Sequence, residues 1–592
     1  MLKPVEQASA REQPLLRAKL FFQSFIALLR DAPGTAKRFW ILVMVTGLAS
    51  GLTAAILVKV LNFVQRMTWS SFSGQTFLAA VENASLPRRL LVPLAGGLLI
   101  SAISLALRRP LKGHGTAAII ESIWMKSGRV PFVSTIVRAI ASIFAVAMGA
   151  PLGREGALLQ SGSATASWMA RQLRIPADQA RLLVACGAAS GLAAAYNVPI
   201  GAALFGLEVF LGSFALELFG PIVVSCVVAT LVSRILISNH PSYLIPHYEF
   251  VSIRELLLIL IFGPLLGLAS ALYVRTINAW SVVLEPIPRR WARWLPVISM
   301  GAVGAFSIWF PQLLGNGYNS VNAALLDSLP LVLLLVLPAL KLMATAICAA
   351  SGVPGGMFTP CLFFGALLGG AFGHLMHFAW NDMAPPGAYA LMGMAAILGG
   401  TTHAAVSSVL IIFELTGNYA VILPLMLTTV LSTAISQWIE PESLYTAVLK
   451  RRKVSLPPSL QPSWLNSLTV RSLLSNAQES ISPATEFEKV VARLLELPAG
   501  ADLYVTTPEG RLLGIILLET LKGHLPQQSM LRCVIAADVM TTEIKSVTLN
   551  MSLQEVALRF SALSVERLPV VDELGRLMGT VSKSDILRHS RF

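Results

Sequence analysis

Charged residues and paired cysteines are scarce in this sequence. Only 13% of its 592 residues are Asp, Glu, Lys or Arg and 55% are hydrophobic, which is far from the composition of a soluble globular protein. The five cysteines are scattered, and none has the spacing of a metal site or of a disulfide framework. The motifs HExxH and GxSxG are absent, and no aspartates pair within the apolar runs. These absences argue against a soluble protein, a metal site and an enzyme.

Long apolar runs recur from Trp40 to about Trp438, and the composition becomes ordinary after Tyr445. The pattern predicts an N-terminal segment at 1–39, a membrane domain at 40–450, a Pro-rich linker at 451–467 and a soluble domain at 468–592. Several runs are shorter than the roughly 20 residues that cross a bilayer, which indicates discontinuous helices. The expected apolar segments are 40–64, 90–107, 135–150, 181–211, 215–237, 255–274, 296–309, 330–350, 358–380, 387–400 and 405–438.

The net charge of +14 comes from basic residues that flank the apolar runs, so we expect no nucleic-acid partner. By the positive-inside rule, basic clusters on both sides of the membrane domain predict that both termini are cytoplasmic. The first 39 residues lack the pattern of a cleaved signal and are predicted to form an amphipathic helix at the membrane surface. The clusters are Lys3, Arg11, Arg17, Lys19, Lys37 and Arg38 before the first run, and 450–453 after the last.

The stretch Gly153-Arg154-Glu155-Gly156 places a carboxylate between glycines at the start of an apolar segment. Ionisable groups at membrane depth are costly and usually face a water-filled pathway. Glycines leave backbone N–H groups uncovered at a helix start, where the helix dipole attracts anions. Two interpretations stay open. Either Glu155 is a gate that competes with a permeant anion for the helix start, or Arg154 and Glu155 form an interfacial pair that only caps a helix.

Two spacings recur in the two halves of the membrane domain. Gly113 stands 40 positions before Gly153, as Gly315 does before Gly355, and a second pair of residues in each half is 11 positions apart. These pairs are Asn197 with Glu208 and His403 with Glu414. The spacings predict a tandem duplication whose halves cross the membrane in opposite directions, so that helix amino termini converge at mid-membrane.

Two further features support an anion pathway. The stretch 355–360, Gly-Gly-Met-Phe-Thr-Pro, opens an apolar helix with consecutive backbone donors and no acidic residue in the following turns. Tyr445 ends the membrane domain with a phenol that can donate a hydrogen bond. The alternative for Tyr445 is an interfacial aromatic anchor.

Taken together, these motifs resemble the CLC family of chloride channels and chloride/proton exchangers, over residues 40–450 and including 187–199 and 414–417. The resemblance implies an all-α polytopic membrane domain with an inverted repeat and discontinuous helices. It implies that Glu155 is the gating glutamate, that Tyr445 donates to a central chloride site, and that the protein is a homodimer with one pore in each subunit. A prokaryotic-type member is expected in the bacterial inner membrane. The other expected anion-binding positions are His114, Gly115, Arg154, Gly156, Gly356, Met357 and Phe358.

One departure from the family concerns the anion site. His114 stands where the family has a serine, and Ala157 replaces a proline of the glutamate motif. A neutral imidazole donates one hydrogen bond, and a protonated one adds a charge that tightens anion binding in acid. The alternative is that backbone N–H groups bind the anion while the ring packs aside. Fluoride or nitrate transport is therefore a more distant possibility than chloride transport.

A second departure concerns proton coupling. Proton-coupled members of the family carry a second glutamate just after the stretch that corresponds to 197–208, and this sequence has Val209 there. We interpret the neighbouring Glu208 as structural. The resemblance thus favours a passive chloride channel gated by protonation of Glu155, with pH- and voltage-dependent opening. The H+/Cl− exchanger is the alternative.

Residues 468–525 and 534–592 each predict a short strand, a helix, two strands and a closing helix. They resemble an α/β pair of CBS domains, of which the first copy is degenerate. Ser582 and Asp585 have the spacing of nucleotide-binding members, and the first copy lacks such a pair because Glu519 and Thr520 are out of register. A structural pair that stabilises the dimer is favoured, and adenine-nucleotide binding is the alternative. Apart from chloride as a bound ion, no cofactor is expected.

Overall fold

The chain forms two compact units, residues 1–455 and 456–592. The computed structural model describes residues 35–70, 75–107, 115–238, 243, 245–246, 248, 253–380, 383–452, 454, 470–474, 479–497, 502–517, 534–542, 544–551, 553–562 and 565–585. Most of the predicted N-terminal helix, His114 and most of the predicted linker lie outside these residues.

Unit 1 is helical, as the apolar runs predict, and seven of its described helices are long and apolar enough to cross a membrane. The first half contains α2 (Thr35–Trp69), α3 (Phe77–Glu82), α4 (Leu86–Ala106), α5 (Gly115–Met125), α6 (Phe132–Ala147), α7 (Glu155–Gln172), α8 (Ala177–Tyr196), α9 (Pro199–Phe205), η1 (Gly206–Leu211) and α10 (Leu216–Leu236). The second half contains α11 (Ile253–Val283), α12 (Arg289–Ala292), α13 (Leu295–Phe306), η2 (Pro311–Leu313), α14 (Tyr318–Leu325), α15 (Leu331–Ala350), α16 (Phe358–Ala379), α17 (Pro386–Thr402), α18 (Ala405–Thr416), η3 (Tyr419–Val421), α19 (Ile422–Ile439) and α20 (Thr446–Arg451).

Two of the expected apolar segments are not continuous helices. The segment 181–211 is broken at Asn197, which ends α8 in the left-handed conformation with φ 60°. Asn tolerates this conformation, and Pro199 then starts α9, so the chain changes direction between the two helices. The segment 405–438 is broken at Gly417, which ends α18 with φ 61°. The apolar runs predicted each of these pairs of helices as one segment, because hydrophobicity carries no information about the backbone φ angle.

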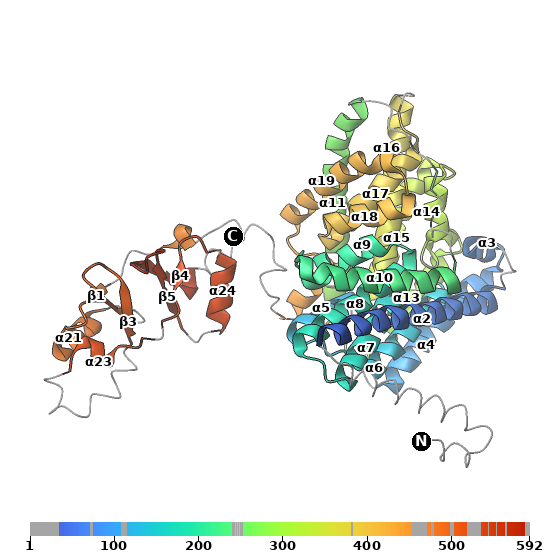
Figure 1. The fold of residues 1–592 in the computed structure, drawn as a ribbon. Helices are drawn as coiled ribbons and strands as arrows, with labels where there is room; N and C mark the ends of the chain where they lie inside the picture. The colour runs from blue at the N-terminus through green and yellow to red at the C-terminus, as the bar shows by residue number, and fades with distance from the viewer. Residues whose placement is uncertain are drawn as a thin grey trace, which may run out of the picture. The chain divides into compact units, whose positions relative to one another are not determined.

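The two halves cap each other's helices. Glu208, in η1, accepts a hydrogen bond of 2.8 Å from the Ser407 N–H at the start of α18. Glu414, in α18, accepts one of 2.7 Å from the Gly201 N–H at the start of α9. These reciprocal contacts, together with the shared left-handed caps Asn197 and His403, confirm the predicted repeat. In Figure 1, helices α11 and α16–α19 lie together on one side of the unit and α2 and α4–α8 on the other, where α13 packs on α4.

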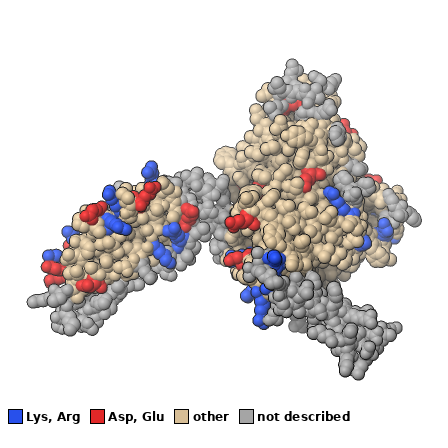
Figure 2. Space-filling view, in the orientation of Figure 1, with Lys and Arg blue, Asp and Glu red and all other residues tan. Residues whose placement is uncertain are grey.

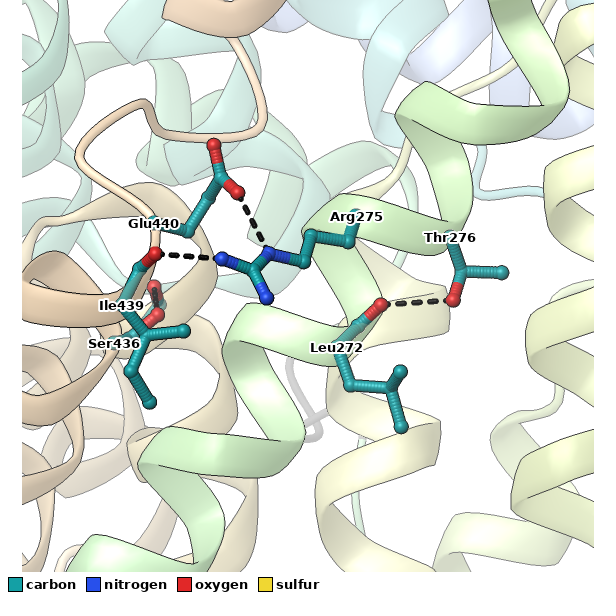
Figure 3. A network of polar contacts seen from close by, with 7 residues as sticks. Leu272, Arg275, Thr276, Ser436, Ile439 and Glu440 are labelled. Atoms are coloured by element: carbon teal, nitrogen blue, oxygen red, sulfur yellow. Dashed lines mark hydrogen bonds and ion pairs between the residues drawn. The ribbon is translucent and has the colours of Figure 1, made fainter.

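Arg275 on α11 holds the end of α19 (Figure 3). Its Nε lies 3.0 Å from Glu440 Oε2, and its Nη2 donates a hydrogen bond of 2.8 Å to the Ile439 carbonyl. A cation at the carboxyl end of a helix interacts favourably with the helix dipole and with the free carbonyl groups there. The contact therefore fixes the point from which the chain continues to Tyr445.

The surface of unit 1 fits contact with lipid. Figure 2 shows few charged residues over most of the visible face of this unit. Large apolar side chains are exposed on its long helices, and exposed apolar surface of this extent marks contact with a membrane or with another protein. Examples are Ile56, Phe63, Leu216, Leu231, Leu257, Leu272, Leu423 and Trp438.

Unit 2 contains two small sheets of the predicted order. The first copy has β1 (Glu479–Ile481), α21 (Phe487–Glu496), β2 (Leu503–Thr506) and β3 (Leu512–Ile516). The second copy has β4 (Val547–Thr548), α24 (Leu553–Ala562), β5 (Arg567–Val571) and β6 (Leu577–Ser582). In each sheet the first two strands are parallel and the last two antiparallel. Residues 518–525 and 586–592, where the closing helices are predicted, lie outside the described residues.

In each copy, the short helix that precedes the first strand packs into the core of the other copy. The short helix η6 (Val470–Leu473) packs into the core of the second copy, and Val470 N–H donates to the Met551 carbonyl at 3.0 Å. Helix α23 (Ala536–Val539) packs into the core of the first copy, next to Phe487 and Val490. Each copy thus needs the other to complete its core.

Candidate anion-binding site

The two glycine motifs lie back to back at the starts of α7 and α16. Gly153 and Gly356 exchange two backbone hydrogen bonds, of 2.8 Å and 2.7 Å. A Cβ on Gly156 would lie 2.9 Å from the Gly356 nitrogen, so only glycine permits this approach. Residues 200 to 203 positions apart therefore bring two helix amino termini together, one from each half.

Glu155 turns its carboxylate onto the start of α16. The side chain is buried, with 2% exposed. Oε1 accepts a hydrogen bond of 3.1 Å from the Thr359 N–H, and Oε2 accepts one of 2.8 Å from the Thr359 hydroxyl. A Cβ on Gly153 or Gly356 would lie 2.0 or 2.2 Å from Oε1, so both glycines make room for the carboxylate. A negative group thus occupies donors that could equally hold a small anion.

Arg154 points away from Glu155. Its guanidinium lies 5.2 Å from the centre of the Tyr318 ring, and its Nη2 donates to the Ala195 carbonyl at 3.4 Å. Arg154 also lines a cavity of about 180 Å³ between α2, α3 and α14. The two side chains therefore do not form the capping pair considered from the sequence. Arg154 instead places a positive charge at the cavity next to the site.

Met357 and Phe358 are buried where α16 starts, and Phe358 joins an aromatic cluster that reaches Tyr445. The Phe358 ring is 6.1 Å from that of Phe205, which is 6.5 Å from the Tyr445 ring. Tyr445 is only 3% exposed, which differs from an aromatic side chain at a membrane surface. Its hydroxyl faces Thr116, in the first turn of α5.

The start of α5 completes the arrangement. Gly115 begins this helix, and a Cβ there would lie 1.8 Å from Gln160 Nε2, so the Gln160 amide on α7 rests on Gly115. His114 lies outside the described residues, and its role stays a prediction. The contacts join Glu155, Gly156 and Gly356 directly, while Met357 and Phe358 start the same helix and Phe205 links Phe358 to Tyr445. Gly115 reaches this group through Gln160 on α7, and Arg154 lies at the adjoining cavity.

The position at which proton-coupled members of the family carry a second glutamate is apolar and buried in this chain. Val209 is 7% exposed and lies in η1. The neighbouring Glu208 is fully engaged, because its carboxylate accepts hydrogen bonds from the Val406 N–H, the Ser407 N–H and the Ser407 hydroxyl. These contacts place Glu208 as a cap on the start of α18, and its structural role stays a prediction.

Ser582 and Asp585 bond to each other in unit 2. The Ser582 hydroxyl donates to Asp585 Oδ2 at 2.5 Å, and the Asp585 N–H donates to Ser582 Oγ at 3.1 Å. This is the geometry of a helix N-cap, which explains their spacing without a ligand. Nucleotide binding at this pair stays a prediction.

Three buried polar residues had no role in the sequence analysis. Thr359 contacts Glu155 directly, and the Tyr196 hydroxyl lies 2.8 Å from Thr359 Oγ1. Lys341 donates hydrogen bonds of 2.8 and 2.7 Å to the Leu313 and Gly315 carbonyls and so holds the glycine turn of the second half. In each case a polar residue within an apolar stretch indicated a buried polar contact, but the sequence did not identify its partner.

Comparisons with known proteins agree with this geometry. The model of the voltage gated chloride channel family matches residues 96–437, and that of the CBS domain matches residues 536–591. A ClcB-like chloride channel protein of Ralstonia nicotianae is 36% identical over 420 residues, which cover 67% of this chain and 94% of that protein. The voltage-gated ClC-type chloride channel ClcB of Escherichia coli K12 is 33% identical over 375 residues, covering 62% of this chain and 88% of ClcB.

Two solved structures share the fold. The crystal structure of a slow cyanobacterial Cl−/H+ antiporter has a TM-score of 0.63 at 21% identity and covers 70% of this chain and 97% of its own. That of a eukaryotic CLC transporter has a TM-score of 0.60 at 19% identity and covers 95% of this chain and 98% of its own. The family match spans more than half of the chain and includes both glycine motifs. This chain therefore belongs to the voltage-gated chloride channel family, CLC.

Proposed function

We propose that this protein conducts chloride passively across a membrane and that Glu155 is its gate. The observation that carries the proposal is the position of the Glu155 carboxylate on the N–H and hydroxyl donors at the start of α16. An anion that enters from the cavity beside Arg154 meets these donors already occupied by a negative group. Chloride and the carboxylate therefore compete for one site.

Protonation of Glu155 opens the path in this account. A neutral carboxyl group gains less from helix-start donors than a carboxylate does, so the anion displaces it. Because Glu155 is charged and buried in the membrane unit, its movement is also sensitive to voltage. Opening should therefore respond to both pH and voltage.

A channel is favoured over an H+/Cl− exchanger by the absence of a proton acceptor at Val209. The carboxylate of the neighbouring Glu208 holds the start of α18. An exchanger would have to bring protons to Glu155 through water or through Glu208, whose carboxylate is bound to the Val406 and Ser407 N–H groups. Coupling each chloride step to a proton step is harder along such a route.

The proposed assembly is supported by family membership and by charge. We propose a homodimer with one pathway in each subunit, in the bacterial inner membrane, with both termini in the cytoplasm. The basic residues before the first span and at 450–453 support this orientation. We assign unit 2 a structural role in the dimer, with adenine-nucleotide binding at Ser582 and Asp585 as the alternative. The protein is not proposed to be an enzyme or to bind nucleic acid.

Chloride efflux from liposomes at a series of external pH values tests the gate. Wild-type efflux should rise as the pH falls, because protonation releases the carboxylate. Glu155→Ala and Glu155→Gln should give high efflux that changes little with pH, since neither side chain carries a charge. If the pH dependence of efflux is unchanged in Glu155→Ala, Glu155 is not the gate.

A further inference from the structure

Two hydroxyl groups lie in a row behind the Glu155 carboxylate. Thr359, in the first turn of α16, lies 2.8 Å from Glu155 Oε2 through its Oγ1. The hydroxyl of Tyr196, the last residue of α8, lies 2.8 Å from the same Thr359 oxygen. All three side chains are buried. The row thus joins the two halves of the membrane unit at the proposed gate.

The direction of the hydrogen bonds follows from the number of protons. An ionised carboxylate has none, so the Thr359 hydroxyl donates its single proton to Glu155. Thr359 can then only accept from Tyr196, which must donate. The row runs from Tyr196 to Thr359 to Glu155, and each group is fixed by the one behind it.

Packing holds Tyr196 in this position. Its ring centre is 5.1 Å from that of Phe358 and 6.4 Å from that of Tyr318. Rotation of the ring away from Thr359 would break these contacts in a closely packed region. The donor is therefore in place before the carboxylate arrives.

We propose that Thr359 and Tyr196 are positioning residues that hold the ionised Glu155 carboxylate in the closed position. The inference rests on the proposed gating role of Glu155. Thr359 binds the carboxylate directly, and Tyr196 orients the Thr359 hydroxyl. Hydrogen bonds to an ionised group are about twice as strong as those between neutral groups. The hydroxyl row therefore favours the closed state beyond what the backbone N–H groups provide.

The test is chloride efflux at neutral pH from liposomes that contain the full-length protein. Thr359→Val keeps the shape and the backbone N–H of residue 359 but removes the hydroxyl, and should raise efflux by roughly ten-fold. Tyr196→Phe should raise it less, because Thr359 then keeps its proton for Glu155 but loses its orienting donor. Thr359→Ser should restore efflux close to wild type.

A matched control uses another buried threonine. Thr429 on α19 donates within its own helix, to the Leu425 carbonyl at 2.7 Å, and Thr429→Val should leave efflux unchanged. Size-exclusion chromatography and the apparent melting temperature report whether each variant folds. If Thr359→Val does not fold, Tyr196→Phe, which retains the packed ring, carries the same test.

A Glu155→Ala background separates this inference from the proposed function. With no carboxylate to hold, Thr359→Val should not raise efflux above that of Glu155→Ala alone. Two results would overturn the positioning role and leave the gate intact. In the first, Thr359→Val raises efflux equally with Glu155 and with Ala at position 155. In the second, Thr359→Val has wild-type efflux while Glu155→Ala has raised efflux. Wild-type efflux of Glu155→Ala would overturn the gate itself.

Discussion

The carboxylate of Glu208 accepts hydrogen bonds from both the backbone N–H and the hydroxyl of Ser407, which lies 199 positions away in the other half of the membrane unit. Glu414 makes the corresponding contacts to the Ile200 and Gly201 N–H groups, at 3.0 and 2.7 Å. The repeat therefore supplies two carboxylates with the same structural task, of which only Glu208 lies beside Val209.

This symmetry provides a test of whether Glu208 carries protons. Glu208→Ala and Glu414→Ala should each weaken a helix start by about 1–2 kcal/mol and lower the apparent melting temperature by similar amounts. Neither should change the pH dependence of chloride efflux in the folded fraction. A change in pH dependence for Glu208→Ala alone, with Glu414→Ala as the matched control, would show that Glu208 has a role in proton movement.

Because the two glycine motifs approach closely, we expect a side chain at Gly356 to lower the free energy of unfolding. In Gly356→Ala the new Cβ would lie 2.2 Å from Glu155 Oε1 and 2.7 Å from the Gly156 nitrogen. The carboxylate must leave and the paired backbones must shift, which should cost about 1–3 kcal/mol. We expect higher efflux at neutral pH and a lower apparent melting temperature.

Gly220→Ala is the control for this substitution, because among the described residues its Cβ would meet only the Trp40 side chain, at 3.3 Å. It should match wild type in efflux and in melting temperature. Wild-type efflux of Gly356→Ala at neutral pH would mean that Glu155 does not rest against Gly356.

Some of this site could be predicted from the sequence because its signals are local. Glycines around Glu155 and in 355–358 mark helix starts, and equal spacings mark the repeat. The partners of Glu155 could not be predicted, because Thr359 is 204 positions away and the pairing depends on how the halves pack. The same holds for Glu208, whose cap lies on α18. The break at Asn197 was missed because its signal is a backbone conformation within an apolar run.

The prediction for His114 rests on its place in the sequence, because residue 114 lies outside the described residues. If its ring donates to the anion, His114→Ser should shift the pH dependence of efflux and change the permeability of bromide, nitrate and fluoride relative to chloride. We expect these shifts because residue 114 directly precedes Gly115 at the start of α5. The control is His403→Asn, since Asn197 shows that asparagine fits the matching left-handed cap. Wild-type selectivity and pH dependence in His114→Ser would assign anion binding to the backbone N–H groups.

The most direct test of the central claim is the reversal potential of the reconstituted protein, with equal chloride on both sides of the bilayer and a pH gradient across it. A passive channel reverses at the chloride equilibrium potential, which is zero under these conditions, whatever the pH gradient. This is the result we predict, because Val209 provides no proton acceptor and Glu208 is held by Ser407. A reversal potential displaced by the pH gradient, or proton movement driven uphill by a chloride gradient, would contradict the account and identify the protein as an exchanger.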